Sequence, residues 1–397
     1  MILLLQRSPV FRFDEWLGDL AREAVLFTQL AEGGGEGYAE VVRIPSFDAD
    51  GRTELRILER HARTPFSAVV PMSEYDLIRA ARLRERFGIP GQSVASAVAY
   101  RNKVRMKELV SAAGIAVPGF RAIESPLDLV AAAEAWGYPL VVKPVDGGGS
   151  RGVTIVRDGA ALEKLLAGGC PANAMVEQFV PGQVCHVDGL ARNGTVEFSA
   201  ASRYLNDCLG FQSGRSVGST LLDPRSDLAQ RLNAAVAAVV RALPPTPVLT
   251  YHAEFFHTPD DRIVFCEIAS RCGGSRIIET IEAGYGVSVS RAWVRWQVGL
   301  PEDVTGHPFD PAGWLLIPAL NQGRLVRIPE RIPFPWTSHY WPVKKPGDLV
   351  GNAQSSVDGI ATMIVRGEND AAVNERLQEL DAWFVRSLEW EPASAGA

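Results

Sequence analysis

Cysteine is scarce in this chain, and long hydrophobic runs are lacking. The five cysteines, at positions 170, 185, 208, 266 and 272, are odd in number and show no C-x-x-C spacing. A disulfide framework is therefore excluded, and a structural zinc site is disfavoured. The apolar segment Met1–Leu5 is followed directly by polar residues, so it is too short for a signal peptide or a membrane span. We expect it to be a buried strand, in a cytoplasmic protein.

A block of basic charge is also lacking. The chain has 40 Lys and Arg against 46 Asp and Glu, a net charge of −6, which argues against nucleic acid and membranes as partners. No internal repeat or low-complexity tract is present. The chain has 397 residues, of which 47% are hydrophobic. This length and composition predict two or three packed units.

The order of strand-like and helix-like runs predicts an α/β (α+β) fold in three units. Residues 1–98 alternate short β-branched runs with amphipathic stretches, which predicts a small α/β layer. Residues 99–300 place strands on both sides of a glycine-rich loop. Prolines become frequent after residue 300, and residues 301–397 predict three strands and a terminal helix.

Apolar residues at helical spacing predict the long helices. The expected ranges are Glu74–Phe87, Val94–Ala113, Leu228–Leu243 and Ala371–Trp390. The second of these is expected to run unbroken until Gly114 ends it.

The glycine-rich loop is the most informative segment. A β-branched run ends at Lys143, three successive glycines and Ser150 follow, and a second β-branched run begins at Val153. Glycines let an anion approach backbone N–H groups closely, and the lysine adds a compact positive charge. Because the lysine precedes the glycines and a strand follows them, the loop is no P-loop. The pattern predicts a polyphosphate-binding hairpin, with an ordinary tight turn as the alternative.

Two alternating segments, 250–256 and 262–271, predict a second hairpin, which brings two acids together. Glu254 and Glu267 would face each other across the ladder, where like charges repel unless a cation lies between them. Mg²⁺ favours such carboxylates and shares phosphate oxygens with a nucleotide. The alternative is a solvated face, but Phe255 and Phe265 favour a core position, in which unpaired carboxylates are costly.

Together these motifs resemble the ATP-grasp carboxylate–amine ligases, over about residues 70–300. The segment 267–271 is closest in form to the L-amino-acid ligases that make dipeptides. The resemblance implies an ATP-grasp fold with a Rossmann-like pre-ATP-grasp domain at 1–98, an ATP-grasp domain at 99–300 and a C-terminal α+β domain at 301–397. The ATP-grasp domain would divide into a lid-type subdomain with the phosphate loop, 99–180, and a metal-binding sheet, 181–300.

The resemblance also assigns residues to ATP. A helix supplies the first lysine, for which we prefer Lys103 to Lys107, and a hinge near residue 178 receives adenine. The ATP-binding residues implied in this way are Lys103, Lys143, Gly148, Gly149, Ser150, Glu177, Gln178, Phe179 and Val180. The family often holds the ribose with a glutamate where this chain has Val184, so we expect Gln183 or His186 to substitute.

The same resemblance makes Glu254 and Glu267 the ligands of Mg²⁺ or Mn²⁺. The usual asparagine is replaced by Ala269, so either the ion has fewer protein ligands or one of two ions binds weakly. His252 shares a strand face with Glu254 and would reach the metal shell or the amine, unless it is a packed core histidine.

For catalysis, the resemblance implies that Arg271, together with Lys143, stabilises charge on the transferred phosphate. Arginine also matches a carboxylate bidentately. The residues expected to contact the substrate are Arg215, Gly273, Gly274 and Arg276.

The implied reaction begins with attack of a substrate carboxylate on the γ-phosphate of ATP, which gives an acylphosphate and ADP. An amine then displaces phosphate and forms an amide, so small-molecule carboxylates and amines are the expected partners, and a homodimer is the assembly common in the family. Two alternatives stay open. One is an ATP-binding regulatory module of the same fold, and the other is an ATP-dependent carboxylase resembling biotin carboxylase.

Overall fold

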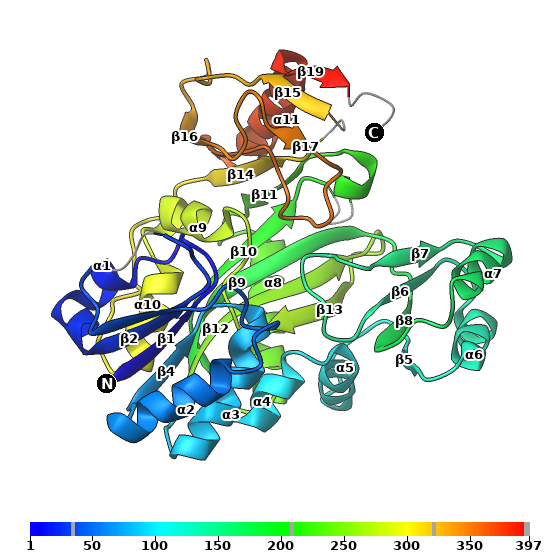
Figure 1. The fold of residues 1–397 in the computed structure, drawn as a ribbon. Coiled ribbons are helices and arrows are strands. Elements are labelled where there is room, and N and C mark those ends of the chain that lie inside the picture. Colours follow the sequence, from blue (N-terminus) through cyan, green and yellow to red (C-terminus); the bar gives the residue numbers. More distant parts are fainter. Residues whose placement is uncertain (33–35, 207–209, 320–322, 393–397) are drawn as a thin grey trace.

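The computed structural model describes residues 1–32, 36–206, 210–319 and 323–392. Cys208 lies outside the described residues. Three lobes meet around a central sheet (Figure 1). The N-terminal residues form the first lobe, in which they pack against elements from the middle of the chain. Residues 120–178 project to the side as the second lobe, and the C-terminal residues form the third.

A parallel sheet forms the core of the N-terminal lobe. Its strands, in spatial order, are β3 (Glu40–Arg43), β2 (Ala24–Thr28), β1 (Ile2–Gln6) and β4 (Ala68–Pro71). All residues of β1 and β2 are buried, as in parallel strands covered on both faces. Two helices, α2 (Thr53–Arg63) and α3 (Leu77–Phe87), cover one face. The buried strand predicted at the N-terminus is confirmed.

The prediction of one unbroken helix over Val94–Ala113 is wrong. The chain forms two helices instead, α4 (Val94–Ala99) and α5 (Lys103–Ala112), because the Asn102 side chain accepts a backbone hydrogen bond three residues on, at 2.9 Å. Such an N-cap begins a new helix. The break places Lys103 at the first position of α5, next to the glycine-rich loop.

An antiparallel sheet forms the lobe at the right of Figure 1. Its strands, in spatial order, are β5 (Phe120–Ile123), β8 (Ala174–Gln178), β6 (Leu140–Pro144) and β7 (Thr154–Val156). Two helices pack on it, α6 (Pro126–Trp136) and α7 (Gly159–Ala167). The glycine-rich loop joins β6 to β7, as predicted. We did not predict β5 or α6.

The central sheet has eight strands. In spatial order they are β13 (Ile263–Ala269), β12 (Val248–His257), β9 (Gln183–Arg192), β10 (Thr195–Tyr204), β11 (Val217–Leu221), β14 (Ala312–Ile317), β18 (Ala361–Arg366) and β16 (Thr337–Pro342). One face packs on α8 (Asp227–Ala242), and the other packs on α9 (Ile277–Tyr285) and α10 (Val289–Gln297). Strands from beyond residue 300 extend the same sheet that carries the acidic hairpin.

The C-terminal lobe packs α11 (Asp370–Ser387) against the central sheet. The helix predicted to reach Trp390 is wrong at its end, because the chain becomes extended at Leu388. The last strand joins a small antiparallel sheet, in the order β17 (Leu349–Val350), β15 (Gly323–Arg327) and β19 (Glu389–Pro392). Within the described residues, none of the helices has the length and apolar character needed to cross a membrane.

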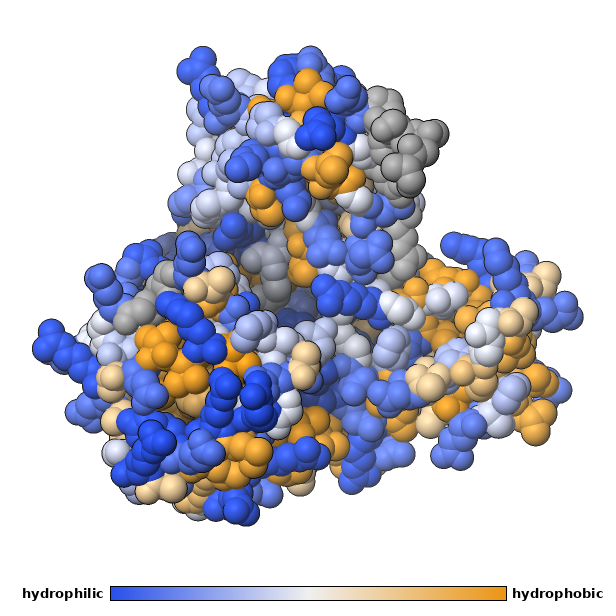
Figure 2. All heavy atoms as spheres, in the orientation of Figure 1, coloured by the Kyte–Doolittle hydropathy of each residue, from blue (hydrophilic) through white to orange (hydrophobic). Residues whose placement is uncertain are grey.

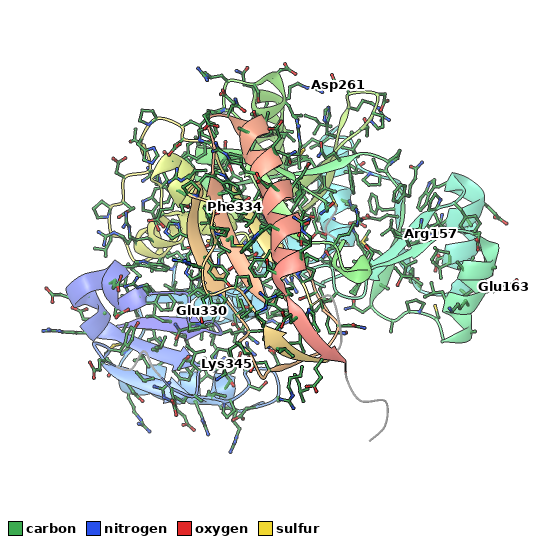
Figure 3. The ribbon with its side chains drawn as sticks, turned by 90° about the horizontal axis from the view of Figure 1, so that it is seen from above. Arg157, Glu163, Asp261, Glu330, Phe334 and Lys345 are labelled. Atoms are coloured by element: carbon green, nitrogen blue, oxygen red, sulfur yellow. The ribbon has the colours of Figure 1, made fainter. Side chains whose placement is uncertain are left out.

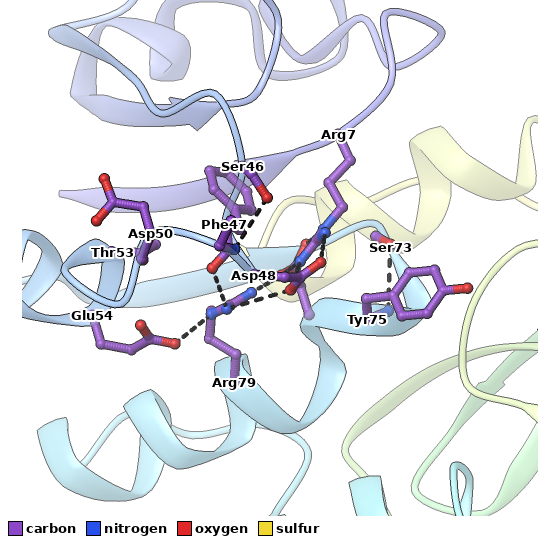
Figure 4. A network of polar contacts seen from close by, with 12 residues as sticks. Arg7, Ser46, Phe47, Asp48, Asp50, Thr53, Glu54, Ser73, Tyr75 and Arg79 are labelled. Atoms are coloured by element: carbon purple, nitrogen blue, oxygen red, sulfur yellow. Dashed lines mark hydrogen bonds and ion pairs between the residues drawn. The ribbon is translucent and has the colours of Figure 1, made fainter. Parts of the chain in front are cut away.

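A buried carboxylate ties the N-terminal lobe together. Asp76 is fully buried and accepts hydrogen bonds from Arg7 at 2.6 and 2.7 Å, and it also pairs with Arg79. Arg7 reaches outward to Asp48 at the surface (Figure 4). Since Asp76 ends the short helical turn that begins at Glu74, this cluster fixes the segment that carries Glu74 toward the central sheet.

We predict that Asp76→Ala lowers the free energy of unfolding by about 3–5 kcal/mol, because it removes a fully buried carboxylate and leaves two partly buried arginines without their shared partner. Urea denaturation measures the change. The matched control is Asp48→Ala: the Asp48 side chain is 62% exposed, so its removal should cost less than about 1 kcal/mol. Equal losses in the two variants would contradict the prediction.

Candidate functional site

A cavity of about 360 Å³ lies between the sheet of the side lobe and the central sheet. Figure 2 shows the surface hollowed where the three lobes meet. The cavity walls contain residues of both predicted hairpins and of the segment after β8. The lining residues considered below are Lys103, Lys143, Gly147, Gly148, Ser150, Glu177, Gln178, Phe179, Val180, Val184, Glu254 and Glu267.

Two lysines enclose one glutamate at the inner wall of this cavity. Glu177 Oε2 lies 2.9 Å from Lys143 Nζ, and Oε1 lies 3.1 Å from Lys107 Nζ. All three side chains are buried. Lys107 also donates to the Cys266 carbonyl at 2.5 Å and does not line the cavity, whereas Lys103 does. The structure therefore brings Lys103 rather than Lys107 to the cavity, in line with our preference.

These contacts keep the buried groups charged. Burial alone would lower the pKa of Lys143, but the Glu177 and Glu267 carboxylates raise it above its ordinary value. Burial would likewise raise the pKa of Glu267, but the positive charges of Lys103 and Lys143 lower it to about 2. Glu267 is therefore a carboxylate at neutral pH, the form that binds metal ions.

The glycine-rich loop is held in place from three sides. Lys103 Nζ donates to a loop carbonyl at 2.6 Å, and the Ser356 N–H of the C-terminal lobe donates to the Gly149 carbonyl at 3.1 Å. A Cβ at Gly148 would lie 2.8 Å from Glu74 Oε2. Glycine at position 148 therefore lets this carboxylate approach the backbone of the loop closely.

The two predicted acids stand directly opposite each other. Glu254 and Glu267 are cross-strand partners in the ladder of β12 and β13, and both line the cavity. Glu267 Oε2 lies 3.6 Å from Lys103 Nζ and 3.8 Å from Lys143 Nζ. The arrangement therefore offers two oxygen ligands for a divalent cation beside the positive charges that polyphosphate needs.

A buried aspartate lies between two histidines next to these acids. Asp188 is 2.9 Å from His252 Nδ1 and 2.6 Å from His186 Nδ1. Burial would lower the pKa of His252, but Asp188 raises it to about 9. His252 Nε2 then lies 3.5 Å from Glu254 Oε1. His252 is the cross-strand partner of Ala269, the position at which asparagine was expected. The histidine side chain therefore lies beside Ala269 on the same face of the sheet.

Arg271 lines a smaller cavity, of about 70 Å³, which shares Ser150, Glu254 and Glu267 with the first. Its Nε lies 3.2 Å from Glu74 Oε2. The guanidinium is thus aimed at the place where the phosphate loop and the acidic hairpin meet. Gly274 also lines this smaller cavity.

Four predicted residues, Gln183, Arg215, Gly273 and Arg276, line neither cavity, and His186, the other residue expected at the ribose, also lines neither. Gln183 and Arg215 line a neighbouring groove. Arg276 donates to Thr362 at 2.9 Å and to Glu279 at 2.6 Å, so its guanidinium is engaged in the packing of α9 against β18. The ribose contact expected for Gln183 and the carboxylate contact expected for Arg215 stay predictions, whereas the guanidinium of Arg276 already has protein partners.

Sequence reasoning missed Glu74, Arg101 and Asp188. Arg101 pairs with Glu74, and no local motif marks either residue. Asp188 follows His186 by two residues on one strand, a period that places both on one face. A Cβ at Gly273 would lie 2.5 Å from Asp188 Oδ1, so this glycine makes room for the aspartate. The two-residue spacing of His186 and Asp188 in a buried strand was the signal in the sequence that could have revealed Asp188.

Comparison with known proteins identifies the domain. Residues 108–281 match the model of the ATP-grasp domain family. An L-arginine-specific L-amino acid ligase of Bacillus subtilis is 26% identical over 324 residues, which cover 79% of this chain and 78% of that protein. A D-alanine–D-alanine ligase of Gloeobacter violaceus is 34% identical over 172 residues, which cover 40% of this chain and 55% of that enzyme.

Solved structures share the fold over the whole chain. The L-amino acid ligase from Bacillus licheniformis has a TM-score of 0.79 at 19% identity, with 99% of this chain and 98% of that chain covered. The biotin carboxylase domain of a Hydrogenobacter thermophilus 2-oxoglutarate carboxylase, solved with MgADP, has a TM-score of 0.70 at 15% identity, with 98% and 90% covered. The predicted ATP-grasp fold is confirmed.

We predict that Glu267→Ala weakens binding of MgATP roughly tenfold to a hundredfold, since a charged ligand interaction of ~1.5–3 kcal/mol is lost. Titration calorimetry measures the affinity, and circular dichroism should show an unchanged fold. The control is Glu163→Ala, an exposed acid on α7 at the outer side of the side lobe (Figure 3). Near-normal affinity in Glu267→Ala would refute the metal assignment.

Proposed function

We propose that this chain is an ATP-dependent carboxylate–amine ligase of the ATP-grasp family, and that both of its substrates are amino acids, which it joins into a dipeptide. One observation supports the site assignment above all. A single cavity holds two facing carboxylates, Lys103, Lys143 and a glycine-rich loop, and Arg271 lies beside it. That combination of charges fits a nucleoside triphosphate with its divalent cation.

In this proposal the nucleotide lies along the cavity wall. The segment Gln178–Val180 borders the adenine, and the N–H groups of the glycine-rich loop surround the phosphates. Lys103 and Lys143 neutralise phosphate charge. Glu177 orients Lys143 from behind, because its carboxylate is shared between two buried lysines.

The residues present fit a hard divalent cation. Glu254 and Glu267 face each other as carboxylates, and burial has not protonated Glu267, whose pKa is about 2. Mg²⁺ or Mn²⁺ held by these two residues would neutralise charge on the phosphates of ATP. His252, fixed by Asp188, orients Glu254 from the position next to Ala269.

Arg271 stabilises the negative charge that develops when a substrate carboxylate attacks the γ-phosphate. Glu74 holds its guanidinium in position and also pairs with Arg101. The side lobe and the Ser356 segment border the loop and exclude water, which would otherwise hydrolyse the acylphosphate. The amine then displaces phosphate, so the products are an amide, ADP and phosphate.

Two observations support amino acids as the substrates. The relative that aligns along 79% of this chain is named as an L-amino acid ligase. The cavity beside Arg271 holds about 70 Å³ and is bordered by Trp314 and Ile277, so it has room for a small group next to the reacting phosphate. The homodimer and the cytoplasmic location that the sequence suggests stay predictions.

We expect the purified protein with MgATP to release phosphate in the presence of a suitable pair of L-amino acids. A phosphate-release screen over amino-acid pairs finds the substrates, and mass spectrometry should find a product with the mass of the pair less one water. Bicarbonate with an acceptor amine serves as the comparison for a carboxylase. Phosphate release with bicarbonate alone, or none under any condition, would contradict the proposal.

A further inference from the structure

A second cavity, distant in sequence from the phosphate loop, lies between the N-terminal lobe and the central sheet. It holds about 260 Å³ and is lined by residues of β4, α3, α10 and the start of β12. We call it the Arg84 cavity. Its walls are mostly apolar, with Val69, Val248, Leu249, Trp293 and Trp296 among the lining residues.

Arg84 is a buried cation in this cavity with no acid beside it. The residue is 5% exposed. Its Nη2 donates to the Val69 carbonyl at 2.5 Å and to Gln297 Oε1 at 2.9 Å, and among the described residues it forms no ion pair with Asp or Glu. Burial alone lowers the pKa of Arg84 to about 10. A buried charge without an oppositely charged partner lowers the free energy of unfolding, so Arg84 destabilises the fold at this position.

The remaining donors of Arg84 are available to a ligand. Within the part of the chain that the structure describes, Nε and Nη1 make no hydrogen bond, although both belong to a nearly buried side chain that lines the cavity. A Cβ at Gly91 would lie 2.7 Å from Nε. Glycine at position 91 therefore packs directly against the guanidinium, where a side chain would clash. Neither Nε nor Nη1 is fully enclosed, so both can donate to a molecule in the cavity.

The lining defines the chemistry of that partner. Arg84 supplies one positive charge, which suits a single carboxylate and not a polyphosphate, and Nε or Nη1 can donate to one of the carboxylate oxygens. The two tryptophans and the valine and leucine side chains suit an apolar body. No Asp or Glu lines the cavity, so the ammonium group of a free amino acid would find no counter-ion.

We propose that the Arg84 cavity binds a small carboxylic acid with an apolar body and no amino group, with its carboxylate on Arg84. The site is separate from the ligase site, since the two share no lining residue. The two sites are nevertheless adjacent in sequence. Ser270 lines the Arg84 cavity, and the next residue, Arg271, lines the smaller cavity of the ligase site. Ser270 is also joined to Gln92 by a hydrogen bond at 3.1 Å.

The test uses 4-bromobenzoate as the probe, with 4-bromobenzamide as its neutral counterpart. Calorimetry on the full chain should show binding of the carboxylate and not of the amide. A crystal soaked with 4-bromobenzoate should show anomalous bromine density in the Arg84 cavity. Absence of binding, or bromine density only in the ligase site, would overturn the proposal.

Variants assign the binding to Arg84. Arg84→Met should weaken it by about tenfold or more, because the charged hydrogen bonds are lost, and methionine fills similar space without needing a counter-ion. Arg86→Met, an exposed arginine on the same helix, should bind normally, as should Glu267→Ala. Val248→Phe keeps Arg84 but fills the cavity, so it should also lose binding. Unchanged affinity in Arg84→Met or in Val248→Phe would refute the site.

Discussion

The rest of the active site depends on the four charges that meet in the larger cavity. The ladder of β12 and β13 forces Glu254 and Glu267 to face each other, and two lysines from other elements compensate their repulsion. Lys103 comes from the start of α5 and Lys143 from β6, and both lie within 4 Å of Glu267. The side lobe, α5 and the acidic hairpin therefore meet at one group of opposite charges, which stabilise one another.

The buried charged groups are of two kinds, those with an oppositely charged neighbour and those without one. Glu177 lies between Lys107 and Lys143, and Asp188 lies between two histidines. In both clusters the buried acid lies beside opposite charge and positions groups that act on ligands. Among the residues that the structure describes, Arg84 hydrogen-bonds only to neutral groups and has no acidic partner. A group whose charge is balanced within the fold serves geometry, whereas an unbalanced one is suited to an external ion.

The sequence predicted those parts of the site that depend on local pattern. Strand alternation and turn residues are local, so the acidic hairpin and the glycine-rich loop were predictable. The break at Asn102 was not, because a single capping side chain overrides apolar periodicity. Contacts between distant residues were equally hidden. Glu74 and Arg271 are 197 residues apart, and one partner of Arg276, Thr362, is supplied only by the packing of the C-terminal lobe.

The most direct test of the central claim locates the metal ion. A crystal of the protein with Mn²⁺ and ADP, measured near the manganese absorption edge, should show one anomalous peak at about 2.2 Å from carboxylate oxygens of both Glu254 and Glu267. The buried cluster of His186, Asp188 and His252 is the competing donor set, with ligand atoms within 4.8 Å of one another. A peak in that cluster, or one that touches neither glutamate, would contradict the account.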